Sequence, residues 1–184
     1  MNEIIVIAAS SGGLPPLRLI IAALPASSRA SVFVVWHIGA HPSILPSILQ
    51  QASRLPVLFV ENGAAILPGH IYVAPPDCHI LLAGNAMRLS HGPKVHHTRP
   101  AADPLFISAA KTHGKRVIGI VLSGGDGDGA AGLLAIKQHG GIVFVQDPAE
   151  ALAPSMPHAA IAAVHPDAVL PVAEIARLVS ELRL

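Results

Sequence analysis

Cysteine, aromatic residues and charge are all scarce in this chain of 184 residues. Its single cysteine, Cys78, excludes an internal disulfide framework and fits a reducing compartment, so we expect a cytoplasmic protein. Charged residues make up 12% of the chain, with a formal net charge of +1 and no cluster of Lys and Arg. Nucleic-acid binding requires a basic patch, so we predict no nucleic-acid partner.

Long hydrophobic runs are also missing, although 52% of the residues are hydrophobic. Pro and Gly interrupt each apolar run well before it reaches the length of a membrane span, and the first run lacks the basic flank of a secretory signal. We therefore predict no membrane insertion. Ala, Val, Ile and Leu supply most of the apolar content, as is typical of a buried parallel sheet covered by helices. The length favours one domain, residues 1–184.

Apolar runs with the character of buried strands alternate with helical segments. We expect strands at residues 4–9, 31–37, 56–60, 116–123 and 141–147, and helices at residues 14–24, 43–53, 104–113, 130–138 and 173–182. The middle of the chain holds shorter apolar pieces between turn residues, which predicts antiparallel hairpin pieces at residues 67–77, 79–82 and 87–89. The predicted fold class is α/β: three layers, α/β/α, with a mainly parallel doubly wound sheet and a short antiparallel hairpin segment.

The first predicted strand ends abruptly in two serines and two glycines, residues 10–13, just before a helical segment. In an open α/β sheet such a turn lies at the carboxyl edge, where ligands bind. A serine there can project its hydroxyl out of the sheet, and the glycines let another group approach the backbone. The same residues also suit a plain turn with a helix cap, so the motif alone leaves both interpretations open.

Three residues far apart in the sequence follow the carboxyl ends of predicted core strands: Ser10, His37 and Asp128. Such ends share one edge of a parallel sheet, so the three side chains can meet there. A hydroxyl nucleophile needs a base, and the imidazole needs a carboxylate to orient it. We therefore predict a Ser-His-Asp triad. The plainer alternatives are a structural strand-end histidine and an aspartate that caps the helix beginning near Ala130.

Other candidate sites are weaker. Asp126 and Asp128 lie between glycines like half of a calcium loop, but no glutamate follows at the required distance. His96 and His97 are adjacent, a poor spacing for joint metal ligation, and fit a solvated loop. Cys78 has no second cysteine nearby, and we expect it to be buried packing. No phosphate-binding or dinucleotide-binding motif is present. We predict neither a metal nor a cofactor.

Several segments resemble the catalytic domain of the chemotaxis protein-glutamate methylesterases, the CheB family. The matching family patterns are I-G-A-S-T-G-G at residues 7–13, the strand-end histidine at Trp36-His37, P-G-x-I-Y-x-A-P-x-x-x-H at residues 68–79, R-P-S-V-D at residues 99–103, the segment of the triad aspartate at residues 122–129, and Q-D…G-M-P at residues 146–157. The resemblance covers nearly the whole chain, and the motifs occur in the family's order.

This resemblance implies an activity and roles for single residues. Ser10 would be the nucleophile, His37 its base and Asp128 the orienting carboxylate, while backbone N–H groups of Ser11 and Gly125 would bind the oxyanion. The implied reaction is hydrolysis of glutamate γ-methyl esters on chemotaxis receptors, with glutamine deamidation as a further activity. The implied partner is the methylated cytoplasmic domain of a chemoreceptor.

The chain departs from the family pattern at the aspartate loop. The usual L-T-G-M-G-x-D-G reads Leu-Ser-Gly-Gly-Asp-Gly-Asp-Gly here, so that Gly125 replaces a methionine and Asp126 replaces a glycine. A more flexible loop holds the Gly125 N–H less firmly, and an extra carboxylate raises the pKa of a nearby histidine. Residues 148–155 depart as well, which leaves the choice of substrate open.

Chemotaxis members of the family carry a receiver domain before the catalytic domain, whereas this chain begins almost at its first strand. We therefore expect control through expression or through a partner in trans, such as a receiver domain or a methyltransferase. Two alternative functions remain open: an esterase for a different protein or small-molecule ester, and a catalytically silent interaction module that keeps the fold.

Overall fold

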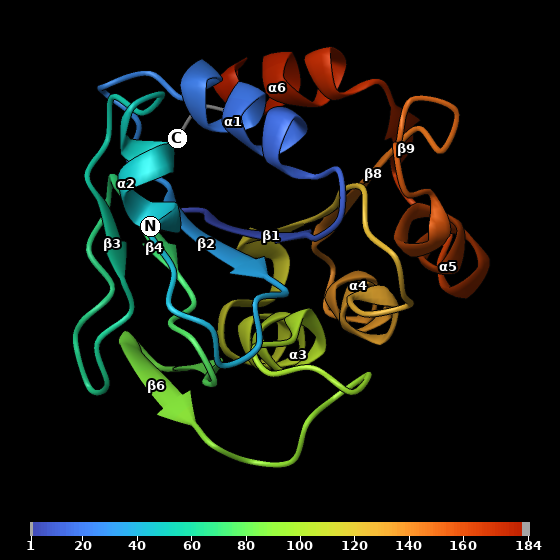
Figure 1. Cartoon of the computed structure of the whole chain (residues 1–184). Helices are drawn as coiled ribbons and strands as arrows, with labels where there is room; N and C mark the ends of the chain where they lie inside the picture. Colours follow the sequence, from blue (N-terminus) through green and yellow to red (C-terminus); the bar gives the residue numbers. More distant parts are fainter. Residues whose placement is uncertain (1, 182–184) are drawn as a thin grey trace.

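A sheet between two layers of helices forms the protein in the computed structural model, which describes residues 2–181 (Figure 1). The strands of the main sheet are β1 (Ile4–Ala9), β2 (Ser31–Trp36), β3 (Val57–Phe59), β4 (His70–Val73), β7 (Val117–Val121), β8 (Ile142–Gln146) and β9 (Ala168–Leu170). They are all parallel, in the order β3-β4-β2-β1-β7-β8-β9. A separate antiparallel hairpin consists of β5 (His79–Ala83) and β6 (Ala86–Ser90). The fold class predicted from the sequence is confirmed.

Helices cover both faces of the main sheet (Figure 1). One face packs against α1 (Leu14–Ala23), α2 (Leu45–Gln50) and α6 (Val172–Glu181). The other face packs against the hairpin and against α3 (Ala102–His113), α4 (Ala130–Gln138) and α5 (Ser155–Ala163), with a 3-10 turn at Gly114–Arg116 leading into β7. No helix within residues 2–181 is long and apolar enough to cross a membrane.

The central strand β1 is buried along its whole length because it lies inside both cores. Successive side chains of a strand point to opposite faces. Val6 accordingly belongs to the cluster that contains Phe106 of α3, and Ile7 to the cluster that contains Ile20 of α1. A continuous apolar run of this kind is what a parallel sheet covered on both faces requires.

Most predicted elements lie close to their observed positions. The helix predicted at residues 130–138 is α4, with the same bounds. The prediction for α3 starts two residues late, because Ala102 already begins the helix. The helix predicted at residues 43–53 is shorter in the structure, and the final predicted helix corresponds to α6, with Leu182 outside the described residues. Cys78 is buried, as expected.

The prediction for residues 67–77 is wrong, because β4 belongs to the parallel sheet and not to a hairpin. It pairs with β2 on one side and β3 on the other. Proline and glycine close to both of its ends suggest isolated turns, but its side chains complete the core: Tyr72 stacks on Phe33 of β2, with ring centroids 5.1 Å apart. The short edge strand β9 was not predicted, since its three residues carry little periodic signal.

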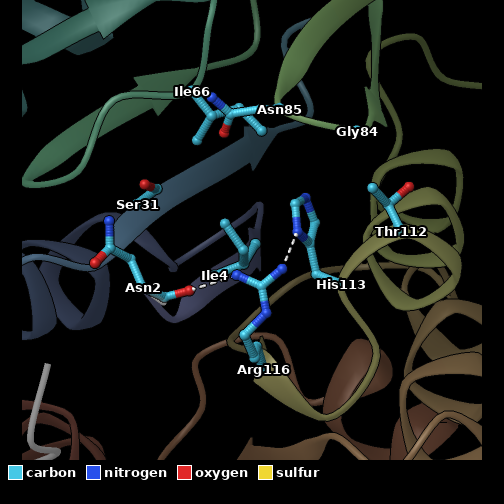
Figure 2. A pocket seen from close by; sticks show the side chains of 9 residues that line it. All are labelled: Asn2, Ile4, Ser31, Ile66, Gly84, Asn85, Thr112, His113 and Arg116. Carbon is cyan, nitrogen blue, oxygen red and sulfur yellow. Dashed lines mark hydrogen bonds between the residues drawn. The ribbon is translucent and has the colours of Figure 1, made fainter.

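A polar pocket of about 340 Å³ lies at the amino-terminal edge of the sheet (Figure 2). Arg116, just before β7, closes one side of it by donating hydrogen bonds to the Asn2 carbonyl and to Nδ1 of His113, each at 3.1 Å. Ser31, the first residue of β2, also lines it. The pocket therefore lies at the end of the strands opposite to the predicted triad.

Candidate active site

Ser10 and His37 are neighbours because of the register between β1 and β2. Ala9 pairs with Trp36, so the next residue of each strand leaves the sheet at the same level. Adjacent strands are about 4.8 Å apart. Ala8 and Val35, two residues before Ser10 and His37, face the cluster that contains α3 and α4. Because residues two apart in a strand point to the same face, the alternation directs the side chains of Ser10 and His37 toward that face as well.

The turn that carries Ser10 is fixed to the neighbouring strand β7. The Ser10 N–H donates to the carbonyl of Ser123 at 2.9 Å, and the Gly13 N–H donates to the carbonyl of Ser10 at 2.8 Å. Gly12 has φ +72°, and a Cβ there would lie 2.5 Å from the Cβ of Leu152. Both the conformation and the close approach favour glycine at this position.

Asp128 lies against His37 from the loop that follows β7. Its Oδ2 is 2.7 Å from Nε2 of His37, and its side chain is fully buried. The same carboxylate accepts the N–H groups of Ala102 and Asp103 at the start of α3. The alternative in which Asp128 caps the following helix is wrong, because α4 has no side-chain cap and Asp128 caps α3 instead.

The electrostatics of this pair favour an ionised carboxylate and a basic imidazole. Burial alone disfavours the charged imidazolium, but the hydrogen bond to Asp128 and the charges of Asp128 and Asp126 raise the pKa of His37 above its ordinary value. Burial also disfavours the charged form of Asp128. Its hydrogen bonds from His37 and from the two N–H groups of α3 nevertheless lower the pKa of this carboxyl.

A second carboxylate approaches the other ring nitrogen of His37. Oδ2 of Asp126 lies 3.4 Å from Nδ1, while Oδ1 of Asp126 accepts the N–H of Asp128 at 2.9 Å. Among the hydrogen bonds of residues 2–181, none joins the hydroxyl of Ser10 to His37. Hydrogen bonds between nucleophile and base are often loose in free enzymes and tighten with substrate.

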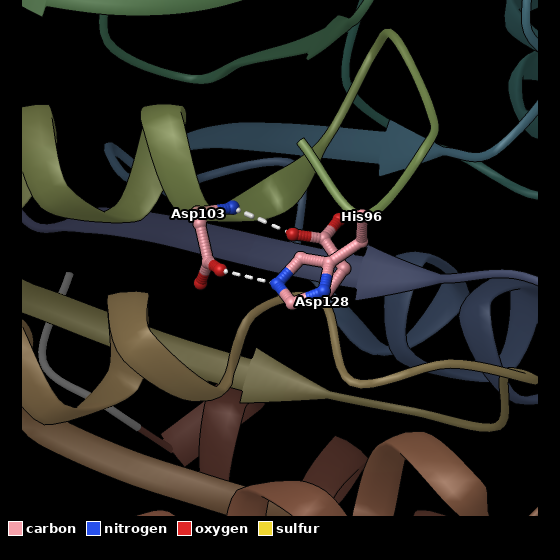
Figure 3. Close-up of side chains that lie close together, drawn as sticks. All are labelled: His96, Asp103 and Asp128. Carbon is pink, nitrogen blue, oxygen red and sulfur yellow. Dashed lines mark hydrogen bonds and ion pairs between the residues drawn. The ribbon is translucent and has the colours of Figure 1, made fainter. Parts of the chain in front are cut away.

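Asp103 and His96 extend the network behind Asp128 (Figure 3). His96 is exposed on a loop, as expected from the sequence, and its Nε2 is 3.0 Å from Oδ2 of Asp103. The other oxygen of Asp103 accepts the N–H of Gly132 in the first turn of α4, at 2.7 Å. Burial, followed by the charge of Asp128, is the main reason why the pKa of Asp103 is raised, even though the Gly132 N–H opposes it.

His96, Asp103 and Asp128 each place one nitrogen or oxygen atom within 4.8 Å of the others, close enough together to hold a metal ion. Each of the carboxylate oxygens nevertheless accepts at least one hydrogen bond from a backbone N–H group or a histidine. Asp128, just before α4, caps α3, and Asp103, in α3, binds the start of α4. We therefore interpret the cluster as a reciprocal tie between two helix ends.

Of the two predicted oxyanion donors, Ser11 lies next to Ser10 in the same turn, and Gly125 lies on the loop after β7. Within residues 2–181 neither backbone N–H has a hydrogen-bond partner, and both residues are exposed. A free and exposed N–H can bind a ligand oxygen. The start of α1 lies beside Ser11, and a helix N-terminus stabilises negative charge.

Two residues without an assigned role in the sequence prediction hold these loops together. Ser123 donates from Oγ to the carbonyl of Ser11 at 2.7 Å, and its own N–H donates to Oε1 of Gln146 at 2.9 Å. Both side chains are buried. The sequence indicates a role for Ser123 and Gln146 only through their position at the carboxyl ends of β7 and β8, which is the edge of the sheet that holds Ser10.

An apolar cavity of about 590 Å³ lies next to the Ser10 turn. It is lined by Gly12, Leu19, Leu152 and Val172, among others. Leu152 is 83% exposed although it is a large apolar side chain. Exposed apolar surface beside a site often serves to bind a ligand or a protein.

Comparison with known proteins finds matches to one family along nearly the whole chain. Residues 5–179 match the family model described as CheB methylesterase. A Burkholderia lata protein named protein-glutamate methylesterase/protein-glutamine glutaminase 3 is 39% identical over 97% of this chain and 50% of its own length. A Leptospira interrogans protein with the same activities in its name, there called putative, is 36% identical over 96% of this chain and 92% of its own length.

A solved structure agrees with these sequence matches. The crystal structure of the Thermotoga maritima CheB methylesterase catalytic domain superposes with a TM-score of 0.93 at 33% identity, covering 99% of each chain. The chain spans about half the length of most of the curated relatives compared with it. The chain belongs to the CheB methylesterase family.

Proposed function

We propose that this protein is a serine hydrolase that removes methyl groups from glutamate γ-methyl esters through Ser10, His37 and Asp128. The observation that carries the proposal is the 2.7 Å contact between Asp128 and Nε2 of His37, on the strand end beside Ser10. That contact assigns Nε2 as the donor to Asp128 and leaves Nδ1 as the only ring nitrogen able to accept a proton from Ser10. The family membership supports the same reaction.

In the first half of the reaction, Oγ of Ser10 attacks the ester carbonyl carbon while its proton moves to Nδ1 of His37. Asp128 stabilises the resulting imidazolium. The carbonyl oxygen becomes an oxyanion, for which Ser11 and Gly125 offer free N–H groups. The carbon–oxygen bond to the methoxy group then breaks, the proton on His37 passes to the leaving oxygen, and methanol departs from an acyl-enzyme.

In the second half, water attacks the acyl carbon and gives a proton to His37. The bond to Ser10 breaks and its oxygen recovers that proton. The net reaction converts one methyl ester and one water into one carboxylate, one proton and one methanol. Replacement of the methoxy group by an amide nitrogen gives the deamidation of glutamine by the same steps, with ammonia as the leaving group.

The substrate in this proposal is a protein segment, the methylated cytoplasmic domain of a chemoreceptor. The apolar cavity beside Gly12 and the exposed Leu152 support a substrate that presents apolar side chains next to the ester. Residues 1–184 are taken as a single catalytic domain that acts in the cytoplasm. Control by a receiver domain or a methyltransferase in trans belongs to the same proposal.

Methanol release from methylated receptor fragments tests this function. Ser10→Ala removes the nucleophile, and Ser11→Ala is its matched control, because it deletes an adjacent hydroxyl while keeping the backbone N–H. We expect methanol release by the wild type and by Ser11→Ala, and none above background by Ser10→Ala.

The alternatives predict different results. An esterase for another ester would release no methanol from receptor fragments but would still react at Ser10 with a fluorophosphonate. A silent interaction module would do neither, and that result would contradict the proposal outright.

A further inference from the structure

His37 lies between two carboxylates and not beside one. Asp128 contacts Nε2 at 2.7 Å from the buried side, and Asp126 reaches Nδ1 at 3.4 Å from a side chain that is 36% exposed. Nδ1 is the nitrogen that must take the proton of Ser10, because Nε2 is committed to Asp128. Asp126 therefore lies against the ring nitrogen that has to accept the proton of Ser10.

We propose that Asp126 is a positioning residue that restrains the esterase, by holding Nδ1 of His37 in an ion pair until its carboxylate turns away and the nitrogen can face Ser10. The inference rests on the proposed triad but not on the identity of the ester. In this role Asp126 selects between two arrangements of His37. In the resting arrangement Nδ1 pairs with Asp126, and in the working arrangement Nδ1 faces Ser10.

The protonation state of the imidazole determines which partner Nδ1 has. With a proton on both nitrogens, His37 donates toward both carboxylates, and Ser10 has no base. Once the Nδ1 proton is lost, a lone pair of the ring faces a lone pair of the carboxylate, and the two repel each other. The hydroxyl of Ser10 is then the better partner, since it can donate to Nδ1.

The construction of the loop permits this exchange. Asp126 is anchored through Oδ1, which accepts the N–H of Asp128 at 2.9 Å, while Oδ2 makes the weaker 3.4 Å contact. A Cβ at the neighbouring Gly125 would meet no atom within 4 Å, so there is open space beside the loop. The side chain of Asp126 is itself 36% exposed, so its carboxylate can rotate toward solvent without disturbing the core.

The charged groups around His37 come from three segments. Asp126 and Asp128 belong to the loop after β7 and act on the imidazole directly. Asp103 of α3, paired with His96 from the preceding loop, lies behind Asp128. Of these groups Asp126 is the one that approaches Nδ1, so its removal changes the base without removing the orienting contact on Nε2.

The first measurement is the titration of His37 followed by NMR of its ring signals. Asp126→Asn removes the charge but keeps an oxygen that can accept the Asp128 N–H, and Asp126→Gly removes the whole side chain. The control is Glu3→Gln, which deletes one negative charge just before β1, about 20 Å away along the strand. We expect the His37 midpoint to move to lower pH in both Asp126 variants and to stay at the wild-type value in the control.

The second measurement is the rate of Ser10 phosphonylation by a fluorophosphonate as a function of pH. In this reaction Ser10 oxygen displaces fluoride from phosphorus and loses its proton to His37, so the rate follows the free base whatever the natural substrate is. We expect faster labelling below the wild-type midpoint in Asp126→Asn and Asp126→Gly, with a similar rate at the alkaline plateau. The control variant should follow the wild-type curve.

The proposal requires both shifts together. Unchanged NMR and labelling midpoints in the Asp126 variants would overturn it, and so would a shift in only one of the two. A failure to release methanol from receptor fragments leaves these readouts intact, so it would count against the proposed substrate and not against the role of Asp126.

Discussion

Asp128 performs two tasks with one carboxylate, and each constrains the other. It accepts backbone N–H groups at the start of α3 while Oδ2 contacts Nε2 of His37. The position of the carboxylate is thus set by a helix end, which is rigid. A rigid carboxylate holds the imidazole in one tautomer and one orientation, as a triad requires.

Replacement of Asp128 by asparagine should therefore disable the base without removing the side chain. The asparagine oxygen will stay with the N–H of Asp103, which places the NH₂ group at the position of Oδ2, facing Nε2 and the N–H of Ala102. Nε2 must then accept, so the proton moves to Nδ1, the nitrogen that Ser10 needs. We expect kcat for ester hydrolysis to fall by about 10³- to 10⁴-fold, with the tautomer change visible in the ¹⁵N shifts of His37.

Activity close to the wild type in Asp128→Asn would contradict this assignment. Asp103→Asn is a suitable comparison, since it changes the neighbouring carboxylate that does not contact His37. Its effect should be confined mainly to stability, through the bond to the Gly132 N–H.

At the scale of elements, the loops after β1 and β7 are packed so closely that glycine is required at Gly124. A Cβ at this position would lie 1.8 Å from Sδ of Met156 in α5 and 3.2 Å from the Cβ of Ser10. At Gly125 the same addition would meet no atom within 4 Å. We therefore expect an added side chain to have different effects on stability at these two adjacent glycines.

Gly124→Ala should destabilise the fold by about 1–3 kcal/mol, because the buried side chain of Met156 must leave its place in the core, or else α5 or the Ser10 turn must shift. Gly125→Ala should leave the free energy of unfolding nearly unchanged and keep its backbone N–H. Urea unfolding of both variants, with esterase rates measured alongside, checks this pair. Equal stability of the two variants would show that the loops are not packed as described.

Much of this arrangement follows from the sequence. Continuous apolar runs predict the central parallel strands, and alternation along them already directs Ser10 and His37 to one face. The shared edge of a parallel sheet then predicts that Asp128 can join them. Strand β4 was misassigned because turn residues flank a short run, and only its contacts with β2 and β3 reveal its place.

The contacts that were not predicted depend on packing between distant segments. The exchange of caps between α3 and α4 requires that the two helix ends meet. The sequence around Asp103 or around Asp128 does not indicate that contact. The sequence does predict that Asp126 raises the pKa of a nearby histidine, as it does for His37, but the approach of its carboxylate to Nδ1 depends on the path of a glycine-rich loop. Local propensity says little about either feature.

For the whole molecule, the coupling of His37 to its carboxylates should appear in the stability of the fold. The pKa of His37 is raised by folding, so its contribution to stability is fully present below the ordinary value of 6.5 and is lost as pH rises through the folded pKa. His113 acts in the opposite direction, since burial and Arg116 lower its pKa. Its contribution is present above the ordinary value and is lost as pH falls.

Thermal unfolding of His37→Gln and His113→Gln across about pH 5 to 9 separates the two contributions. Relative to His37→Gln, the wild type should be more stable at low pH, and the difference should shrink by about 1.4 kcal/mol for each unit of pKa shift as pH rises. Relative to His113→Gln, the trend should reverse. A pH-independent difference for His37→Gln would mean that folding leaves its pKa unchanged.

The central claim is that Ser10 is a nucleophile activated by His37. Covalent labelling with a fluorophosphonate, followed by mass spectrometry of the modified peptide, tests it most directly because no substrate has to be assumed. We predict one adduct per chain on Ser10, retained in Ser11→Ala and lost in Ser10→Ala and His37→Gln. An adduct on Ser11, labelling that persists without His37, or the absence of any adduct would contradict the account.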